Sequence, residues 1–457
     1  MATPVTAGAI ALLLQEYRDT HNGATPRPDV TKSILSSTAT DLDYDPFTQG
    51  SGRVDIYHAV AASAEGGDQR FPGRFFLQSM NSWDSARKLI ENSWELNMKE
   101  APPDTPIGAT NWFAGVVNPG GSASASFSLF HAANPKASAY AFQLVGSKLY
   151  PNQTSGNMSW VTLSKNEIPA GTDLMKITLV YHFSDFANTS TWDVKDQLAA
   201  QLYDTYRDGS LARITNAAPE GTTSELVVSK PLEKFSGVPK VRVVFPDNKS
   251  SIPFELAIRY YKKAPWNWIT KLDINGDILT AALSIPNTAS PGVYAGLLTV
   301  TDGDYATVVP VSVVVPIIAS GRYHDDTVGA PYDNFAVYGA FDWGWRYEAG
   351  DWRTFAIVVP AGVHRIGITV NWSDSETDIQ AHLTSPSGYL VASSDYPTTK
   401  HLDKGKFYWS TSTGGPREYI YTMDSTPGIY LLVLHNTLFG ARTFAYPEEY
   451  TVDVSFL

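Results

Sequence analysis

The chain has 457 residues, more than one hydrophobic core normally organises, so we expect several domains. Its formal net charge is −12 and it contains no cysteine. The charge argues against nucleic acid as a partner, and the lack of cysteine excludes disulfides, zinc–thiolate sites and cysteine nucleophiles.

The first stretch, residues 1–14, has the pattern of a core helix. The i, i+4, i+7, i+8 spacing of one buried helical face is occupied by Val5, Ala9, Leu12 and Leu13. Pro4 stands in the first turn, where a helix tolerates proline, and Gly8 leaves room for another backbone.

The amino-acid sequence of this stretch resembles a family signature. Met-Ala-Thr-Pro-x-x-x-Gly, formed here by Met1, Ala2, Thr3, Pro4 and Gly8, is similar to the motif that follows the serine nucleophile in subtilisin-like serine proteases of the large, pyrolysin-like type. Residues 25–35 resemble that family's next helix, and residues 50–55 resemble its closing glycine turn. Residues 1–63 therefore look like the C-terminal remnant of a subtilase catalytic domain.

The resemblance implies that the nucleophile would immediately precede Met1, and that the catalytic Asp, His and oxyanion Asn lie further upstream. We therefore assign no catalytic residue in this chain and expect it to be inactive alone, since a serine nucleophile needs a base and oriented donors. Without the parallel sheet of such a domain, the helix at residues 1–14 would expose apolar surface. We expect it to be disordered, self-associated or covered by a partner chain.

The next segments look structural. Asp41, Asp43 and Asp45 alternate, but Pro46 and Gly52 stand where an EF-hand loop needs glycine and glutamate, so we interpret this stretch as a solvated turn. Residues 63–69 have the composition of a linker.

From about residue 70 the pattern changes to strands. Residues 113–117 and the face formed by Ala125, Phe127 and Leu129 predict two strands joined by a turn at 118–121. Further alternation predicts strands at 175–181 and 254–260, and Asn-Gly and Asp-Gly predict hairpin turns at 274–277 and 301–304.

These strands predict a mainly β protein, in which the subtilase helices precede β-sandwich and jelly-roll domains. Residues 113–117, 290–300 and 308–315 resemble the Ig-like or fibronectin-like modules of large subtilases. Within 64–318, one sandwich (about 70–150 plus 265–318) could be interrupted by a jelly-roll-like unit (about 160–262), or two sandwiches could follow one another.

A weak internal repeat favours the interruption. Trp192, residues 197–202 and a turn at 208–212 parallel Trp372, residues 378–383 and a turn at 387–392. Two related jelly-roll-like units would explain the match.

The last unit, 319–457, resembles the pre-peptidase C-terminal jelly-roll domain on the pattern of residues 366–374 and 377–388. The resemblance implies a role in stability, secretion or attachment to substrate, and calcium is the metal it suggests. Asp374 and Asp378 are our candidate calcium ligands, because carboxylates on a loop beside a strand suit this ion; turn-capping carboxylates are the alternative.

Other candidate sites depend on single patterns. Trp343, Trp345 and Trp352 could form an aromatic platform, although burial in a sandwich core is the commoner fate. The nine histidines include no HExxH motif. Five Asn-x-Ser/Thr sequons are glycosylation candidates, at Asn152, Asn157, Asn188, Asn248 and Asn371.

We do not expect a membrane span, because the most apolar run, 306–319, contains two prolines and is too short; it predicts a buried strand with a proline exit. The sequence favours the C-terminal part of an extracellular or cell-surface subtilisin-like endopeptidase, whose partners would be the N-terminal protease portion and polypeptide substrates. The alternative is a non-catalytic β-sandwich protein that associates with itself or with a cell-surface layer.

Overall fold

The computed structural model describes residues 2–64, 75–79, 81, 108–153, 158–180, 198–216, 223–244, 253–324, 339–342, 347–350, 352–372, 379–394, 410–412, 416–423, 425–436 and 450–457. The protein is mainly β, with several antiparallel sheets and few helices, so the predicted fold class is confirmed. Contacts divide the chain into two compact units, one formed by Met1–Ala141, Ala264–Ala289 and Val293–Val315, the other by Phe142–Lys263, Ser290–Gly292 and Pro316–Leu457.

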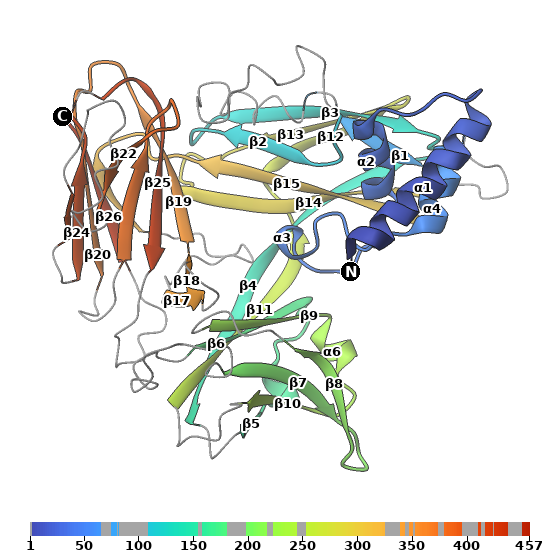
Figure 1. Ribbon diagram of the computed structural model, residues 1–457, viewed down its shortest axis with the longest axis horizontal. Helices are drawn as coiled ribbons and strands as arrows, with labels where there is room; N and C mark the ends of the chain where they lie inside the picture. The colour runs from blue at the N-terminus through green and yellow to red at the C-terminus, as the bar shows by residue number, and fades with distance from the viewer. Residues whose placement is uncertain are drawn as a thin grey trace. The chain divides into compact units, whose positions relative to one another are not determined.

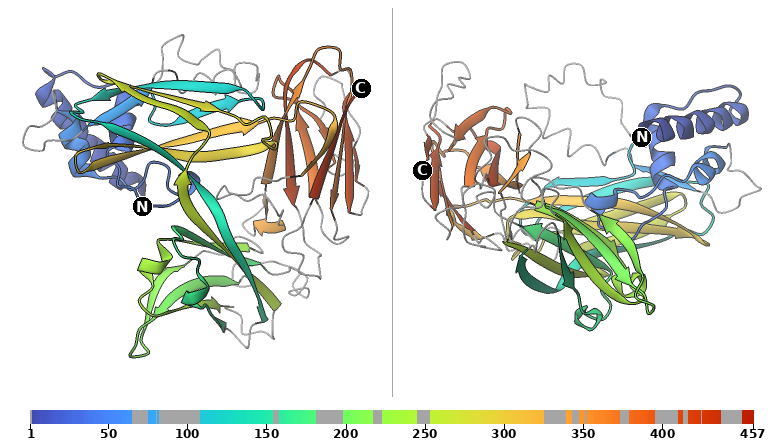
Figure 2. Two further views of the ribbon diagram at one scale, coloured as in Figure 1. Left: turned by 180° about the vertical axis from the view of Figure 1, so that it is seen from behind. Right: turned by 60° about the horizontal axis from the view of Figure 1, so that its bottom comes forward.

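The first unit begins with helices, whose bounds are α1 Ala2–Thr20, α2 Pro28–Ser37, α3 Pro46–Gln49 and α4 Ile56–Ser63. The helix α1 lies beside α4 (Figures 1 and 2). Leu13, Ile34 and Ala59 share a small core with Ala62 and Phe76. Proline at the first position of α2 and α3 suits a helix start, where its missing N–H needs no partner.

The predicted solvated turn is wrong for Asp45. This residue is fully buried and caps α3, because its carboxylate accepts from the backbone N–H groups of Phe47 and Thr48, both at 3.1 Å. Of the predicted linker, Ser63 belongs to α4, and residues 65–69 lie outside the described part of the chain.

A β-sandwich follows in the same unit. One sheet has the order β1-β3-β13-β12, and the other begins β2-β15-β14-β4. The bounds are β1 Phe76–Ser79, β2 Trp112–Val116, β3 Ser122–Phe130, β4 Lys136–Gln153, β12 Ile269–Asn275, β13 Ile278–Ser284, β14 Gly292–Asp302 and β15 Tyr305–Val315. Both predicted hairpin turns are confirmed, as is the buried strand that ends before Pro316.

The predicted strands β2 and β3 form but do not pair with each other. β2 runs parallel to β15, whereas β3 pairs with β1 and β13 in the facing sheet. Phe127 of β3 and Val309 of β15 are buried in the core between these sheets. The turn between β2 and β3 therefore connects two layers.

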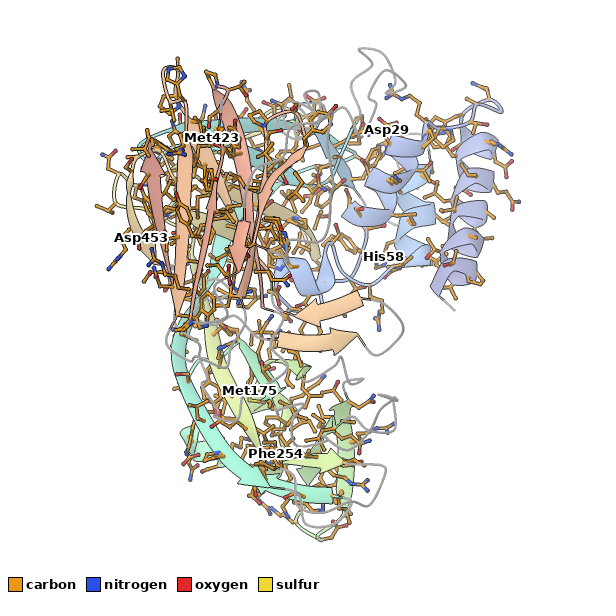
Figure 3. All side chains as sticks on the ribbon, turned by 60° about the vertical axis from the view of Figure 1, so that its left-hand side comes forward. Asp29, His58, Met175, Phe254, Met423 and Asp453 are labelled. Atoms are coloured by element: carbon orange, nitrogen blue, oxygen red, sulfur yellow. The ribbon has the colours of Figure 1, made fainter. Side chains whose placement is uncertain are left out.

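The second unit contains two sandwiches, which we call repeat A and repeat B. Repeat A comprises the end of β4 together with β5 Met158–Thr162, β6 Leu174–Val180, β7 Ala199–Thr205, β8 Leu211–Asn216, β9 Thr223–Ser229, β10 Val238–Val244 and β11 Pro253–Pro265. Two short helical elements, η2 Lys165–Glu167 and α6 Pro231–Lys234, accompany these strands. Met175 of β6 and Phe254 of β11 lie in its core, as the alternation predicts (Figure 3).

Repeat B comprises β16 Gly321–His324, β17 Gly339–Asp342, β18 Tyr347–Gly350, β19 Trp352–Val359, β20 Ile366–Trp372, β21 Ile379–Thr384, β22 Leu390–Ser393, β23 Ser410–Ser412, β24 Arg417–Tyr421, β25 Gly428–Asn436 and β26 Tyr450–Phe456. Its core gathers Ile368 and Val370 of β20, Leu383 of β21 and Leu432 of β25.

The two repeats share one topology. In repeat A the sheets run β5-β10-β7-β8 and β4-β11-β6-β9. In repeat B they run β19-β25-β21-β22 and β16-β26-β20-β24, and β23 adds a fifth strand beside β24. The hairpins also share a register shift, which falls between Leu202 and Tyr203 in β7 and between Leu383 and Thr384 in β21. These are the positions that the short sequence match aligns.

Candidate functional site

The motif residues lie at the start of α1. Met1 lies outside the described residues, the helix begins at Ala2, and Thr3 and Pro4 are exposed in its first turn. The first backbone N–H groups of a helix have no partner within it, so this end favours negative charge.

The helix α1 has one buried and one exposed apolar face. Ala9 and Leu13 are 1% and 0% exposed, but Val5 and Leu12 are 61% and 51% exposed. The expectation that all four share a buried face is therefore wrong for Val5 and Leu12. Gly8 lies between these two in the helix, and among the described residues no atom outside the α1 backbone lies within 4 Å of the position its Cβ would take. Val5, Gly8 and Leu12, at i, i+3 and i+7, form an exposed stripe open to a closely packed neighbour.

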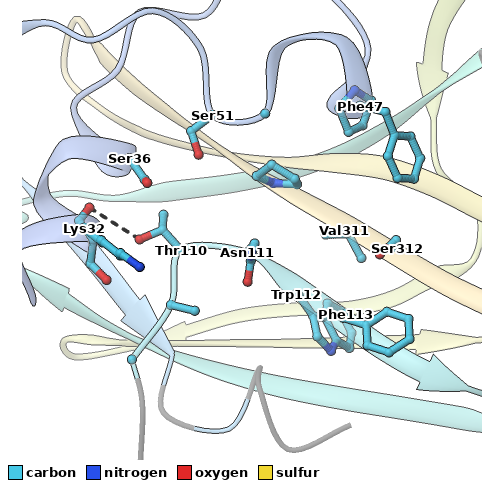
Figure 4. A pocket seen from close by; sticks show the side chains of 16 residues that line it. Lys32, Ser36, Phe47, Ser51, Thr110, Asn111, Trp112, Phe113, Val311 and Ser312 are labelled. Atoms are coloured by element: carbon cyan, nitrogen blue, oxygen red, sulfur yellow. Dashed lines mark hydrogen bonds between the residues drawn. The ribbon is translucent and has the colours of Figure 1, made fainter. Parts of the chain in front are cut away.

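A pocket of about 420 Å³ lies among α2, α3, β2 and β15 (Figure 4). Its lining includes Lys32, Ser36, Ser51, Asn111, Phe113 and Ser312. Ser33, which also lines it, is 1% exposed, and its hydroxyl has no hydrogen-bond partner among the residues that the structure describes. Lys32 is the one titratable side chain among the lining residues, so the pocket offers a cation and hydroxyl groups but no acid–base pair.

Buried hydrogen bonds hold two of the lining residues, Gly108 and Thr110. Asp29, 7% exposed, accepts from the N–H of Gly108 at 2.8 Å and pairs with Arg27 at 2.9 Å. The Thr110 hydroxyl lies 2.9 Å from the carbonyl of Leu77.

A His–Asp pair in α4 has a structural explanation. The His58 Nδ1 lies 2.9 Å from the Asp55 carboxylate, and a smaller pocket of about 260 Å³ adjoins the imidazole. However, Asp55 is the N-cap of α4 and accepts from the His58 backbone N–H at 3.0 Å. The pair therefore fits a capped helix start.

The predicted calcium ligands, Asp374 and Asp378, lie outside the described residues. Within the described ranges, no group of three or more acidic or histidine side chains could hold a metal ion. The alternating carboxylates fit calcium poorly, because Asp41 accepts from the Gln49 amide at 2.7 Å and Asp45 caps α3.

The glycosylation candidates fall in different settings. Asn152 is exposed in β4, whereas the Asn371 amide in β20 donates to the Asp453 carboxylate at 3.1 Å. Asn157, Asn188 and Asn248 lie outside the described residues, as do Trp343 and Trp345, while Trp352 begins β19.

No protein-family model and no curated protein matches the chain. Solved structures that it resembles include a family 123 glycoside hydrolase from Clostridium perfringens (13% identity, 45% of this chain and 23% of that one, TM-score 0.12). Another is the PBSX exported protein XepA (12% identity, 69% of this chain and 86% of that one, TM-score 0.17). A third is tripeptidyl peptidase 2 (11% identity, 100% of this chain and 39% of that one, TM-score 0.19).

These TM-scores are too low to support an argument about fold or function. The chain spans less than a quarter of the hydrolase, the first of these structures. Over the described residues, no helix combines the length and hydrophobicity that a membrane crossing needs.

Proposed function

We propose that this chain is the C-terminal part of a secreted subtilisin-like serine endopeptidase, and that its β-sandwiches stabilise the enzyme or hold substrate. The observation that carries the proposal is α1. It runs from Ala2 to Thr20, accommodates Pro4 in its first turn, and exposes Val5, Gly8 and Leu12 on one side.

The chemistry of such an enzyme explains this helix start. A serine preceding Met1 would lie at the positive end of the helix dipole, where unpaired N–H groups stabilise developing negative charge. The upstream α/β domain would cover the exposed stripe, because parallel sheets bury both faces beneath helices. Each large apolar side chain that it buries would contribute about 1.5–3 kcal/mol.

The test is covalent labelling of the protein from its native source. A fluorophosphonate reacts with an activated serine, and tryptic digestion should give a peptide that ends at Arg18 and contains residues 1–18. We expect this peptide to extend beyond Met1 at its amino end and to carry the probe on the residue before Met1. The chain of 457 residues expressed alone is the matched control and should not be labelled.

A native chain that begins at Met1, has no associated protease portion and takes up no probe would overturn the proposal. The non-catalytic alternative would then account for the exposed stripe by self-association. In that case Leu12→Lys should convert an oligomer to a monomer in analytical ultracentrifugation.

A further inference from the structure

The outer face of the β5-β10-β7-β8 sheet in repeat A carries a cluster that we call the cationic face. It consists of Arg213, Lys240 and Arg242 with Trp160 and Tyr203. In β10 the side chains alternate, so that Val241 and Val243 are fully buried while Lys240 and Arg242 point outward.

The strand register brings these residues together. Arg242 lies opposite Trp160 on β5, Lys240 lies opposite Tyr203 on β7, and Tyr203 lies opposite Arg213 on β8. The Arg242 guanidinium lies 5.9 Å from the Trp160 ring centre, and the Trp160 and Tyr203 rings meet edge to face at 5.4 Å.

Among the described strand residues of this outer face, every charged side chain is positive, although the whole chain carries −12. The neutral positions around the cations are Met158, Trp160, Thr162, Val238, Val244, Ala199, Gln201, Tyr203, Thr205, Leu211 and Asn216. Within the part of the chain that the structure describes, none of the three cations forms an ion pair, and Arg242 Nε is buried without a hydrogen-bond partner. Their charge is therefore available to a ligand.

Repeat B shows that the fold does not need these charges. By strand order, register and the shared register shift, Lys240 corresponds to Leu431, Arg242 to Val433 and Arg213 to Leu390. The same sandwich is built with three apolar residues at those positions. The cations are therefore not required for this topology.

We propose that the cationic face binds an extended acidic polypeptide. Lys240 and Arg242 are two residues apart on one strand, roughly 7 Å, which is also the spacing of carboxylates at alternate positions of an extended chain. Arg213 lies two strands away from Lys240, about 10 Å, and can reach a carboxylate beyond them. Because Arg242 already lies over the Trp160 ring, that ring is less suited to stacking on a sugar.

The test uses the full chain and a fluorescein-labelled peptide of about twelve residues with glutamate at alternate positions. Fluorescence anisotropy should show saturable binding that weakens as salt screens the exposed charges. The same peptide with glutamine for glutamate should not bind. This inference does not depend on the proposed protease function, because the chain is tested without any catalytic portion.

The variant K240L/R242V/R213L gives repeat A the residues of repeat B, so it should keep the thermal unfolding midpoint of the parent. We expect it to bind the peptide roughly tenfold or more weakly, since each exposed ion pair contributes up to about a factor of five. The control R53L/K136V/K271L removes the same charge from exposed positions of the first unit and should bind like the parent.

Equal weakening by both triple variants would overturn the inference, because overall charge would then explain binding. Tighter binding of a sulfated oligosaccharide than of the peptide, with the same loss in K240L/R242V/R213L, would overturn the assignment to a polypeptide. No saturable binding of the peptide by the parent chain at low salt would overturn it as well.

Discussion

Replacing Asp204 with alanine should loosen repeat A selectively. Asp204 lies in β7, is 1% exposed, and accepts from the Ser236 backbone N–H and hydroxyl, both at 2.8 Å, and from the Gly237 N–H at 3.1 Å. These bonds hold the turn between α6 and β10 against β7. Only glycine fits at position 237 of this turn, because an added Cβ would lie 1.7 Å from the Thr205 carbonyl oxygen.

The expected cost follows from the groups left without a partner. The backbone N–H groups of Ser236 and Gly237 lose a charged acceptor, and each loss costs about 1–3 kcal/mol of stability. The hydroxyl of Ser236, an exposed residue, can instead bond to water. We therefore expect a loss of about 3 kcal/mol in the free energy of local opening, or about a hundredfold faster amide exchange.

Hydrogen exchange measured by mass spectrometry separates the two repeats. Peptides covering β7 and β10 should exchange faster in Asp204→Ala, whereas those covering β21 and β25 of repeat B should be unchanged. Asp208→Ala is the control, because Asp208 is exposed in the β7–β8 turn and its bonds to Ser210 are local. Exchange of β7 and β10 within about threefold of the parent would refute the reasoning.

Leu13→Ala should cost about 2–5 kcal/mol in urea unfolding followed by circular dichroism, whereas Leu12→Ala should stay within about 0.5 kcal/mol; equal effects would contradict the two-faced α1. Gly296→Ala places a Cβ 2.4 Å from the Trp266 ring, so the free energy of unfolding of the first unit should fall by about 1–3 kcal/mol and its thermal unfolding midpoint should drop. An unchanged midpoint would mean that the Trp266 ring moves aside without cost. Burial raises the pKa of Glu255, so the contribution of this carboxyl to stability is fully present below its ordinary pKa of 4.5 and is lost as the pH rises. Glu255→Gln should therefore be more stable than the parent near neutral pH and equally stable in acid. A gain in stability that does not change with pH would exclude ionisation of Glu255 as its cause.

Local sequence patterns predicted the individual strands well. Met175, Ile177 and Leu179 alternate, and all three are buried in β6. The Asn275–Gly276 turn joins β12 to β13, since glycine accepts the positive φ of 61° found there. Both signals depend on a few neighbouring residues.

Strand pairing could not be predicted in the same way. β3 pairs with β13, about 150 residues further along the chain, and nothing in either strand specifies that partner. The domain boundaries drawn from composition stay a prediction. Burial of α1 was overestimated for Val5 and Leu12, because periodicity identifies an apolar stripe but not what covers it.

The candidate sites also differ in whether adjacent residues or distant segments form them. The motif at the start of α1 could be read from adjacent residues. The alternation of Lys240 and Arg242 with buried valines was also readable, but their neighbour Arg213 is brought to them by the register of two other strands. The pocket beside Lys32 combines segments from distant parts of the chain, so no local signal marks it.

The shared topology of the repeats also bears on how the chain avoids misfolding. Two copies of one strand order within a polypeptide invite exchange of equivalent strands, a known failure of tandem domains. In a swapped sandwich, β25 would replace β10 beside β7, placing Leu431 opposite Tyr203 and losing the Arg242–Trp160 contact. The different outer faces of the two sandwiches would therefore disfavour such an exchange.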